Sequence, residues 1–237
     1  MALEGRVAVI TGATGGLGRV VAAQLAGQGL RLALVSTNQQ KLEKLKAELG
    51  RADSNVLIHS ADLSDAQSTL MTASVVMQAF GQVDILVHLV GGWVGGARLE
   101  NAQPTDLDAM LRQHVWTTFH LVQAFAPHLR ANGWGRIIAV SSPSAVRPAA
   151  KGSLYAAAKA SQEALLLALS QELKDSGVTV NILQVRTIDT AHELDRQPTP
   201  ANASWSTPEE ISAAVVYLCS DEARQVNGAR IPLYGSS

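Results

Sequence analysis

Two residues whose side chains can exchange protons, Tyr155 and Lys159, are separated by three alanines. On a helix this spacing places both side chains on one face, one turn apart. A phenol has a pKa of about 10 and exchanges protons poorly at neutral pH, but a nearby ammonium group stabilises the phenolate and lowers that pKa. The pair therefore predicts a general acid or base. An ordinary surface tyrosine and lysine on an alanine-rich helix is the alternative.

A third candidate, Ser142, follows an apolar run that is expected to form a strand at 135–140. Its hydroxyl could hydrogen-bond a substrate oxygen while Tyr155 supplies the proton. Serines are also common in turns, where they bond their own backbone. From the residues alone, both interpretations of Ser142 stay open.

Glycines at positions 12, 15, 16 and 18 separate the apolar run 7–10 from the helical pattern 19–25. A strand, a glycine turn and a helix in this order bring free backbone N–H groups and the positive end of the helix to one point, which attracts phosphate. A side chain there would keep a pyrophosphate off the backbone or the helix off the sheet. The stretch predicts a nucleotide-binding turn, although a tight turn in any α/β protein would look similar.

Strand and helix patterns alternate along the whole chain, which predicts an α/β fold. We expect a three-layer Rossmann fold with a doubly wound parallel sheet of about seven strands, formed by one domain over 1–237. Ligands of such a sheet bind at the carboxyl ends of the strands. A loop at 187–206 is expected to form a short lid over the substrate. The expected strands are 7–10, 30–35, 55–59, 84–90, 135–140, 178–185 and 231–233, and the later expected helices are 40–49, 65–80, 105–131, 153–175 and 208–219.

Composition excludes several classes of protein. A net charge of -1 gives no electrostatic case for binding nucleic acid or an anionic membrane. The single cysteine, Cys219, excludes an internal disulfide and a cysteine-based metal site, and we expect no metal. The first residues lack a signal-peptide core, and no run of eighteen apolar residues could span a bilayer. The sequence predicts a soluble cytoplasmic protein with a small-molecule substrate.

Taken together, these motifs resemble the short-chain dehydrogenase/reductase family. The resemblance covers essentially the whole chain, and several independent motifs occur in the expected order and spacing. The residues that carry it are Thr11-Gly-x-x-x-Gly16-x-Gly18, Asp62, Ser142, Tyr155-x-x-x-Lys159, Val180-Asn181 and Asp189-Thr190.

The resemblance implies an NAD(P)(H)-dependent oxidoreductase that transfers a hydride to or from a carbonyl or pterin-like substrate. Tyr155 would be the general acid or base, Ser142 would steady the substrate oxygen, and Lys159 would hold the nicotinamide ribose and lower the pKa of Tyr155. It also implies a homodimer or homotetramer, built through the two long helices. The implied cofactor-binding residues are Gly12, Thr14, Gly15, Gly16, Leu17, Gly18, Ser36, Thr37, Asn38, Asp62, Leu63, Val90, Gly91, Tyr155, Lys159 and Thr190.

Three stretches depart from the family pattern. His88-Leu89-Val90-Gly91 replaces Asn-Asn-Ala-Gly, and Val185-Arg186 replaces Pro-Gly. His114 aligns with an asparagine that takes part in a proton relay. An imidazole can both donate and accept hydrogen bonds, so His114 could hold a relay water. A buried structural histidine is the alternative.

Residues 91–96, 113–118 and 204–208 resemble the corresponding segments of dihydropteridine reductase. Ser142 departs from that branch, which usually lacks the serine. Trp93 and Trp116 could form an apolar wall against a flat substrate. Packing of both tryptophans in the core is the alternative.

The choice between the two nicotinamide cofactors depends on the residues after the second strand. An acidic side chain there would bind the ribose 2′-hydroxyl and repel a 2′-phosphate. Ser36-Thr37-Asn38 offers small hydrogen-bonding side chains instead, which favours NADP(H) over NAD(H).

A different class of function, a non-catalytic NAD(P)-binding sensor or scaffold, would fit the altered residues 88–90 and 185–186. The intact Ser142, Tyr155 and Lys159 argue against it.

Overall fold

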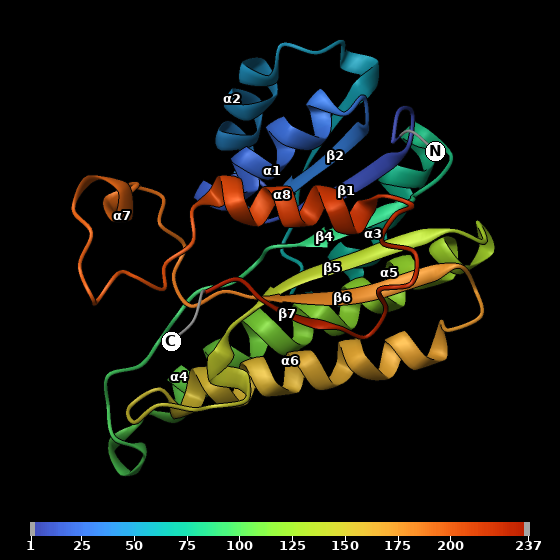
Figure 1. Cartoon of the computed structure of the whole chain (residues 1–237). Coiled ribbons are helices and arrows are strands. Elements are labelled where there is room, and N and C mark those ends of the chain that lie inside the picture. The colour runs from blue at the N-terminus through green and yellow to red at the C-terminus, as the bar shows by residue number, and fades with distance from the viewer. Residues whose placement is uncertain (1–2, 235–237) are drawn as a thin grey trace.

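Seven parallel strands form the central layer of the structure, a computed structural model that describes residues 3–234 (Figure 1). Their order across the sheet is β3-β2-β1-β4-β5-β6-β7, and every neighbouring pair is parallel. The strands are β1 (Val7–Thr11), β2 (Arg31–Ser36), β3 (Val56–Ser60), β4 (Ile85–His88), β5 (Gly135–Ser141), β6 (Val178–Gln184) and β7 (Arg230–Pro232). This arrangement confirms the predicted doubly wound parallel sheet of the Rossmann type.

Helices cover both faces of the sheet, with α1, α2 and α8 on one side and α3, α5 and α6 on the other (Figure 1). Short 3₁₀ turns occupy Asp53–Asn55, Leu99–Asn101 and Pro143–Ala145. The helices are α1 (Gly16–Gly27), α2 (Gln39–Leu49), α3 (Ala66–Phe80), α4 (Pro104–Met110), α5 (Thr117–Ala131), α6 (Ser153–Glu172), α7 (Glu193–Arg196) and α8 (Pro208–Cys219).

The apolar runs of the strands are continuous because helices bury both faces of the sheet. In β1, Ala8 and Ile10 pack into the core under α1 and α8. Val7 and Val9 pack into the opposite core, under α3, α5 and α6. Strand β1 is an interior strand between β2 and β4, and the chain reverses its winding direction between β1 and β4. In open α/β sheets this switch point is where ligands bind.

Four elements differ from their expected form. The long helix expected at 105–131 begins at Pro104 and contains a π-helical segment, Leu111–Trp116. The helix expected at 153–175 ends at Glu172, three residues early. Strand β4 ends at His88, level with the last residue of β1. The loop 187–206 contains the short helix α7 and a bridge between Ile188 and Ser206, and its role as a lid stays a prediction.

Among residues 3–234, no helix is both long enough and apolar enough to cross a membrane.

Candidate active site

The turn between β1 and α1 leaves backbone N–H groups for a ligand. Gly15 is the N-cap of α1, no side chain caps this helix end, and its first turn carries no acidic residue. The first amides of a helix have no partner within the helix, and together with the helix dipole they favour an anion. A Cβ on Gly18 would lie 2.3 Å from the carbonyl oxygen of Gly12, so the helix can pack this closely on the turn only with glycine at position 18.

Two cavities meet at this turn, and both are lined by Gly12, Gly15, Leu89, Val90 and Gly91. The first cavity, of about 580 Å³, extends over the ends of β2 and β3. The second cavity, of about 340 Å³, extends toward α6. Two lobes joined across a glycine turn fit a dinucleotide, whose two halves are joined by a pyrophosphate.

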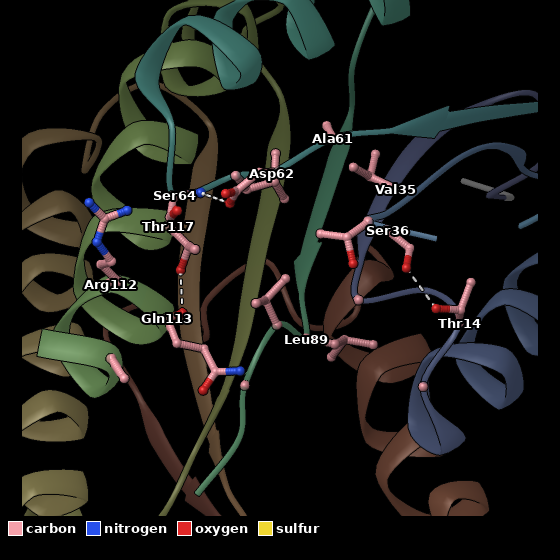
Figure 2. Close-up of a pocket in the computed structure, with 17 residues that line it drawn as sticks. Thr14, Val35, Ser36, Ala61, Asp62, Ser64, Leu89, Arg112, Gln113 and Thr117 are labelled. Atoms are coloured by element: carbon pink, nitrogen blue, oxygen red, sulfur yellow. Dashed lines mark hydrogen bonds between the residues drawn. The ribbon is translucent and has the colours of Figure 1, made fainter. Parts of the chain in front are cut away.

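The first cavity is lined by several of the predicted cofactor-binding residues (Figure 2). The hydroxyls of Thr14 and Ser36 are 2.7 Å apart and hydrogen-bonded. The carboxylate of Asp62 accepts a hydrogen bond from the backbone N–H of Ser64 at 2.9 Å. Thr37 and Leu63 also line this cavity.

Asn38, a predicted cofactor-binding residue, already has a partner within the chain. Its side chain caps α2 by accepting a hydrogen bond from the backbone N–H of Lys41 at 2.9 Å. It is absent from the residues that line the cavities, because the cap draws its amide toward the helix. The opposite wall of the first cavity is formed by Arg112 and Gln113, which the sequence analysis missed (Figure 2).

The predicted catalytic residues Tyr155, Lys159 and Ser142 lie together beside the second cavity. Tyr155 and Lys159 line this cavity from the first turns of α6, and the Lys159 Nζ is 5.9 Å from the centroid of the Tyr155 ring. The Ser142 side chain is close enough to Tyr155 to lower the pKa of its phenol. Ser142 and Tyr155 also line a third cavity, of about 680 Å³, beyond the phenol.

Lys159 is only 4% exposed, and its ammonium group is held by protein acceptors. Its Nζ donates to the carbonyl of Val140 and to Oε1 of Gln162, both at 2.9 Å. The Gln162 amide in turn donates to the Thr118 hydroxyl at 2.9 Å. Burial lowers the pKa of Lys159 to about 7, and the negative charge of Glu163 opposes this shift. The buried amine therefore holds its proton less strongly than an exposed lysine does.

The phenol differs from its expected state. Burial raises the pKa of Tyr155 above its ordinary value, and the hydrogen bond from Ser142 acts in the opposite direction. This direction is opposite to the lowering of the Tyr155 pKa that the resemblance implied for Lys159. In the structure the lysine is already bonded to Val140 and Gln162, and the loss of solvent around the phenol dominates.

His114 lies in the π-helical segment and reaches the second cavity. Its Nε2 is 2.9 Å from the carbonyl oxygen of Gly92, so Nε2 carries the hydrogen and Nδ1 is an acceptor. Nδ1 is buried and has no hydrogen-bond partner among the described residues. Burial, followed by the charge of Lys159, lowers the pKa of His114 to about 4, so the imidazole is neutral at physiological pH.

His88, at the end of β4, lies behind the site. Its Nδ1 is 2.8 Å from the hydroxyl of Thr11, and its Nε2 is 3.5 Å from that of Thr117. Burial, followed by the charge of Lys159, lowers its pKa to about 3. These contacts join β1, β4 and α5 and give His88 a structural role.

The two tryptophans differ in position, and neither packs in the core. Trp93 is 62% exposed and lines the second and third cavities. Trp116 is 49% exposed, contacts the rings of Phe119 and His120, and lies outside these cavities. Trp116 therefore lies apart from the cavities beside Tyr155, and its role as a wall of the substrate site stays a prediction. The methyl group of Thr190 lies against Gly16, beside the turn but outside the lining residues.

Two arginines and a tyrosine in the third cavity were also missed as site residues: Arg147, Arg186 and Tyr234. Arg186 was visible in the sequence as a departure directly after the sixth strand. Arg147 and Tyr234 lie in irregular segments, and local sequence patterns do not predict the path of such segments.

A family model described as short chain dehydrogenase matches residues 6–200. The chain is 31% identical to D-threitol dehydrogenase of Mycolicibacterium smegmatis, over 98% of this chain and 93% of that protein. It is 30% identical to 2,3-dihydroxy-2,3-dihydro-p-cumate dehydrogenase of Pseudomonas putida, over 99% and 95% of the two chains.

A solved structure of levodione reductase is similar to this chain with a TM-score of 0.87 and 27% sequence identity, covering 98% of this chain and 97% of that one. These comparisons do not show the predicted resemblance to dihydropteridine reductase.

Proposed function

This chain belongs to the short-chain dehydrogenase/reductase family and is an NAD(P)-dependent oxidoreductase, and on this premise we propose that Tyr155 is its general acid or base. The proposed reaction interconverts a carbonyl group and an alcohol. The observation that supports it best is the meeting of Tyr155, Ser142 and Lys159 beside the glycine turn. The relatives are named for three different substrates, so they support the reaction type and leave the substrate open.

The nicotinamide cofactor supplies or accepts the hydride when it is bound. The free amides at the start of α1 would hold its pyrophosphate. Asp62 and Leu63 would contact the adenine, Val90 and Gly91 would lie under the dinucleotide, and Lys159 would hold the nicotinamide ribose. We propose NADP(H) rather than NAD(H), because the end of β2 offers the hydroxyls of Ser36 and Thr37 to the first cavity in place of a carboxylate.

In reduction, the Tyr155 hydroxyl would give its proton to the substrate oxygen, and in oxidation it would take this proton back. Ser142 would hold the same oxygen by a hydrogen bond. The positive charge of Lys159 would favour the phenolate that forms when the proton leaves, against the rise in the pKa of Tyr155 that burial causes. The protein thus supplies position and charge at the reacting oxygen.

His114 would help to return the proton to Tyr155. A Cβ built on Gly91 would lie 3.9 Å from His114 Nδ1 and 4.0 Å from Lys159 Nζ, so the two nitrogen atoms border the same small space. The acceptor Nδ1 has no protein partner there, and the Lys159 ammonium has one hydrogen beyond those given to Val140 and Gln162. A water bridging the two nitrogens would satisfy both.

The variant Tyr155→Phe tests the proposal. Turnover of a panel of carbonyl compounds is followed through the loss of reduced-nicotinamide absorbance, with Tyr217→Phe on α8 as an exposed control. We expect turnover to fall by about a thousandfold in Tyr155→Phe, since general acid–base catalysis contributes about 10²–10⁴-fold. Cofactor affinity should be kept. Activity retained by Tyr155→Phe would contradict the role of Tyr155, and a wild type without turnover would favour the sensor alternative.

The cofactor proposal is tested by comparing kcat/KM for NADPH and NADH in the wild type and in Ser36→Asp. We expect the wild type to prefer NADPH and the variant to prefer NADH, because the new carboxylate would repel a 2′-phosphate. Equal values for both cofactors in the wild type would contradict it. The homodimer or homotetramer and the cytoplasmic location stay predictions from the sequence.

A further inference from the structure

We propose that the substrate carries an acidic group, a carboxylate or a phosphate, and that Arg147 and Arg186 bind this group next to the reacting carbonyl. The inference rests on the proposed function, because it takes the carbonyl to react at Tyr155 and Ser142. It adds the chemical class of the substrate, which the fold and the relatives leave open.

The third cavity joins the catalytic hydroxyls to the two guanidinium groups. Tyr155 and Ser142 line it, and so do Arg147 and Arg186. Neither this cavity nor the second one has an aspartate or a glutamate among its described lining residues. A cavity whose charged side chains are all cationic attracts anions and raises their local concentration.

The fold brings the two arginines to the same place. Strands β5 and β6 are paired so that Ser141 lies opposite Gln184, and both strands end at this level. Arg186 follows the end of β6 by two residues. Arg147 follows the 3₁₀ turn after β5, and its backbone N–H donates to the carbonyl of Pro143 at 2.9 Å. Both side chains thus start from the edge of the sheet where substrate reaches Tyr155.

Neither guanidinium forms an ion pair with a carboxylate in residues 3–234. Elsewhere in the structure Arg6 pairs with Asp84 and Arg230 with Glu163. Arg186 instead lies near an aromatic ring, with its Cζ 5.9 Å from the centroid of Tyr234. An arginine side chain presents planar N–H groups that match a carboxylate or a phosphate in a bidentate pair. The two side chains are therefore available to an anion from outside the chain.

One of the two arginines, Arg186, could bind the cofactor in place of the substrate. Arg186 also lines the second cavity together with Gly15 and Gly16, where the pyrophosphate is expected. Arg147 lines only the third cavity, on the substrate side of Tyr155. The effect of removing Arg147 therefore separates an anionic substrate from an anionic cofactor.

The test measures anion binding to the full chain saturated with cofactor, by calorimetry at low ionic strength, since salt screens exposed charges. The probes are succinate, its neutral analogue succinamide, and inorganic phosphate. We expect succinate or phosphate to bind at least about tenfold more tightly than succinamide, a difference of about 1.4 kcal/mol. The better of the two anions identifies the acidic group as a carboxylate or a phosphate.

Arg147→Gln and Arg186→Gln should each weaken anion binding by about tenfold while leaving succinamide binding unchanged. Arg224→Gln is the matched control, because Arg224 lines a separate cavity at the amino-terminal ends of β5 and β6. Equal binding of anions and succinamide by the wild type, no binding of either anion, or unchanged anion binding in Arg147→Gln would overturn the proposal.

A second arm compares kcat/KM for oxo acids and for their methyl esters. The wild type should prefer the acids, and Arg147→Gln should lose this preference through a lower kcat/KM for the acids, whereas Arg224→Gln should keep it. Retention of activity in Tyr155→Phe would refute the proposed function but would leave the binding result valid. The two proposals can therefore fail separately.

Discussion

The ring of His114 meets the ring of Tyr155 edge to face, with their centroids 5.5 Å apart. The π-helical segment Leu111–Trp116 holds the imidazole there, and Nε2 is fixed by the carbonyl of Gly92. π-Helical turns are rare in proteins as a whole, and those that occur often lie at functional sites. The contact therefore places a neutral imidazole with one free acceptor nitrogen against the proposed proton donor.

Replacement of His114 by phenylalanine keeps the ring and removes both nitrogens. We expect kcat to fall by about tenfold, because the relay loses its acceptor, while the KM for cofactor stays unchanged. His128→Phe, in the last turn of α5, is the control. A lower melting temperature with unchanged kcat would show that His114 is structural.

A methyl group at Gly18 should damage the cofactor site, whereas the same change at Gly27 of the same helix should not. A Cβ at Gly18 would lie 2.3 Å from the oxygen of Gly12, and one at Gly27 would meet nothing within 4 Å. For Gly18→Ala we expect a loss of about 1–3 kcal/mol in stability from overpacking, with weaker cofactor binding. For Gly27→Ala we expect unchanged binding and a gain of up to about 1 kcal/mol from helix propensity. Urea unfolding and cofactor titration measure both effects, and similar results for the two variants would contradict the assignment.

Features set by local patterns were predictable from the sequence. The apolar runs of β1 and β5 are buried by helices, and the glycines after β1 permit a close helix contact, so the sheet and the tight turn before α1 could be predicted directly. The placement of Tyr155 and Lys159 one turn apart could also be predicted, because one helix carries both residues.

Features set by competition between partners were not predictable. The Asn38 side chain can bind a cofactor or cap a helix, and in the structure it caps the free amides at the start of α2. A π-helical segment differs from an α-helix only in its hydrogen-bond register, so the sequence pattern around His114 did not reveal it. The positions of Arg147 and Trp116 depend on a loop and on the rotation of a helix surface, which only the tertiary structure fixes.

His88 should make the protein sensitive to acid. Its pKa is about 3 in the folded protein, where burial disfavours the charged form, and about 6.5 when unfolded, so below pH 6.5 the unfolded state binds the additional proton. Stability is therefore lost as the pH falls from 6.5 toward 3. Between pH 7 and pH 5 the wild type should lose about 2 kcal/mol more than His88→Asn, as measured by urea unfolding at both pH values. Equal losses in the two proteins would show that the pKa of His88 is not lowered.

The buried carboxylate of Glu163 should make the loss of Arg230 more costly than the loss of both residues together. Glu163 is 1% exposed, accepts a hydrogen bond from Gln184 at 3.1 Å and pairs with Arg230 of the edge strand β7. Arg230→Met leaves this carboxylate without its ion-pair partner and should destabilise the fold by about 3 kcal/mol, at the lower end for a broken buried pair because Arg230 is 43% exposed. Adding Glu163→Gln removes the buried charge and keeps an amide for Gln184, so the double variant should recover most of this loss. Urea unfolding of the two single variants and the double variant measures the coupling, and additive losses would show that the two side chains act independently.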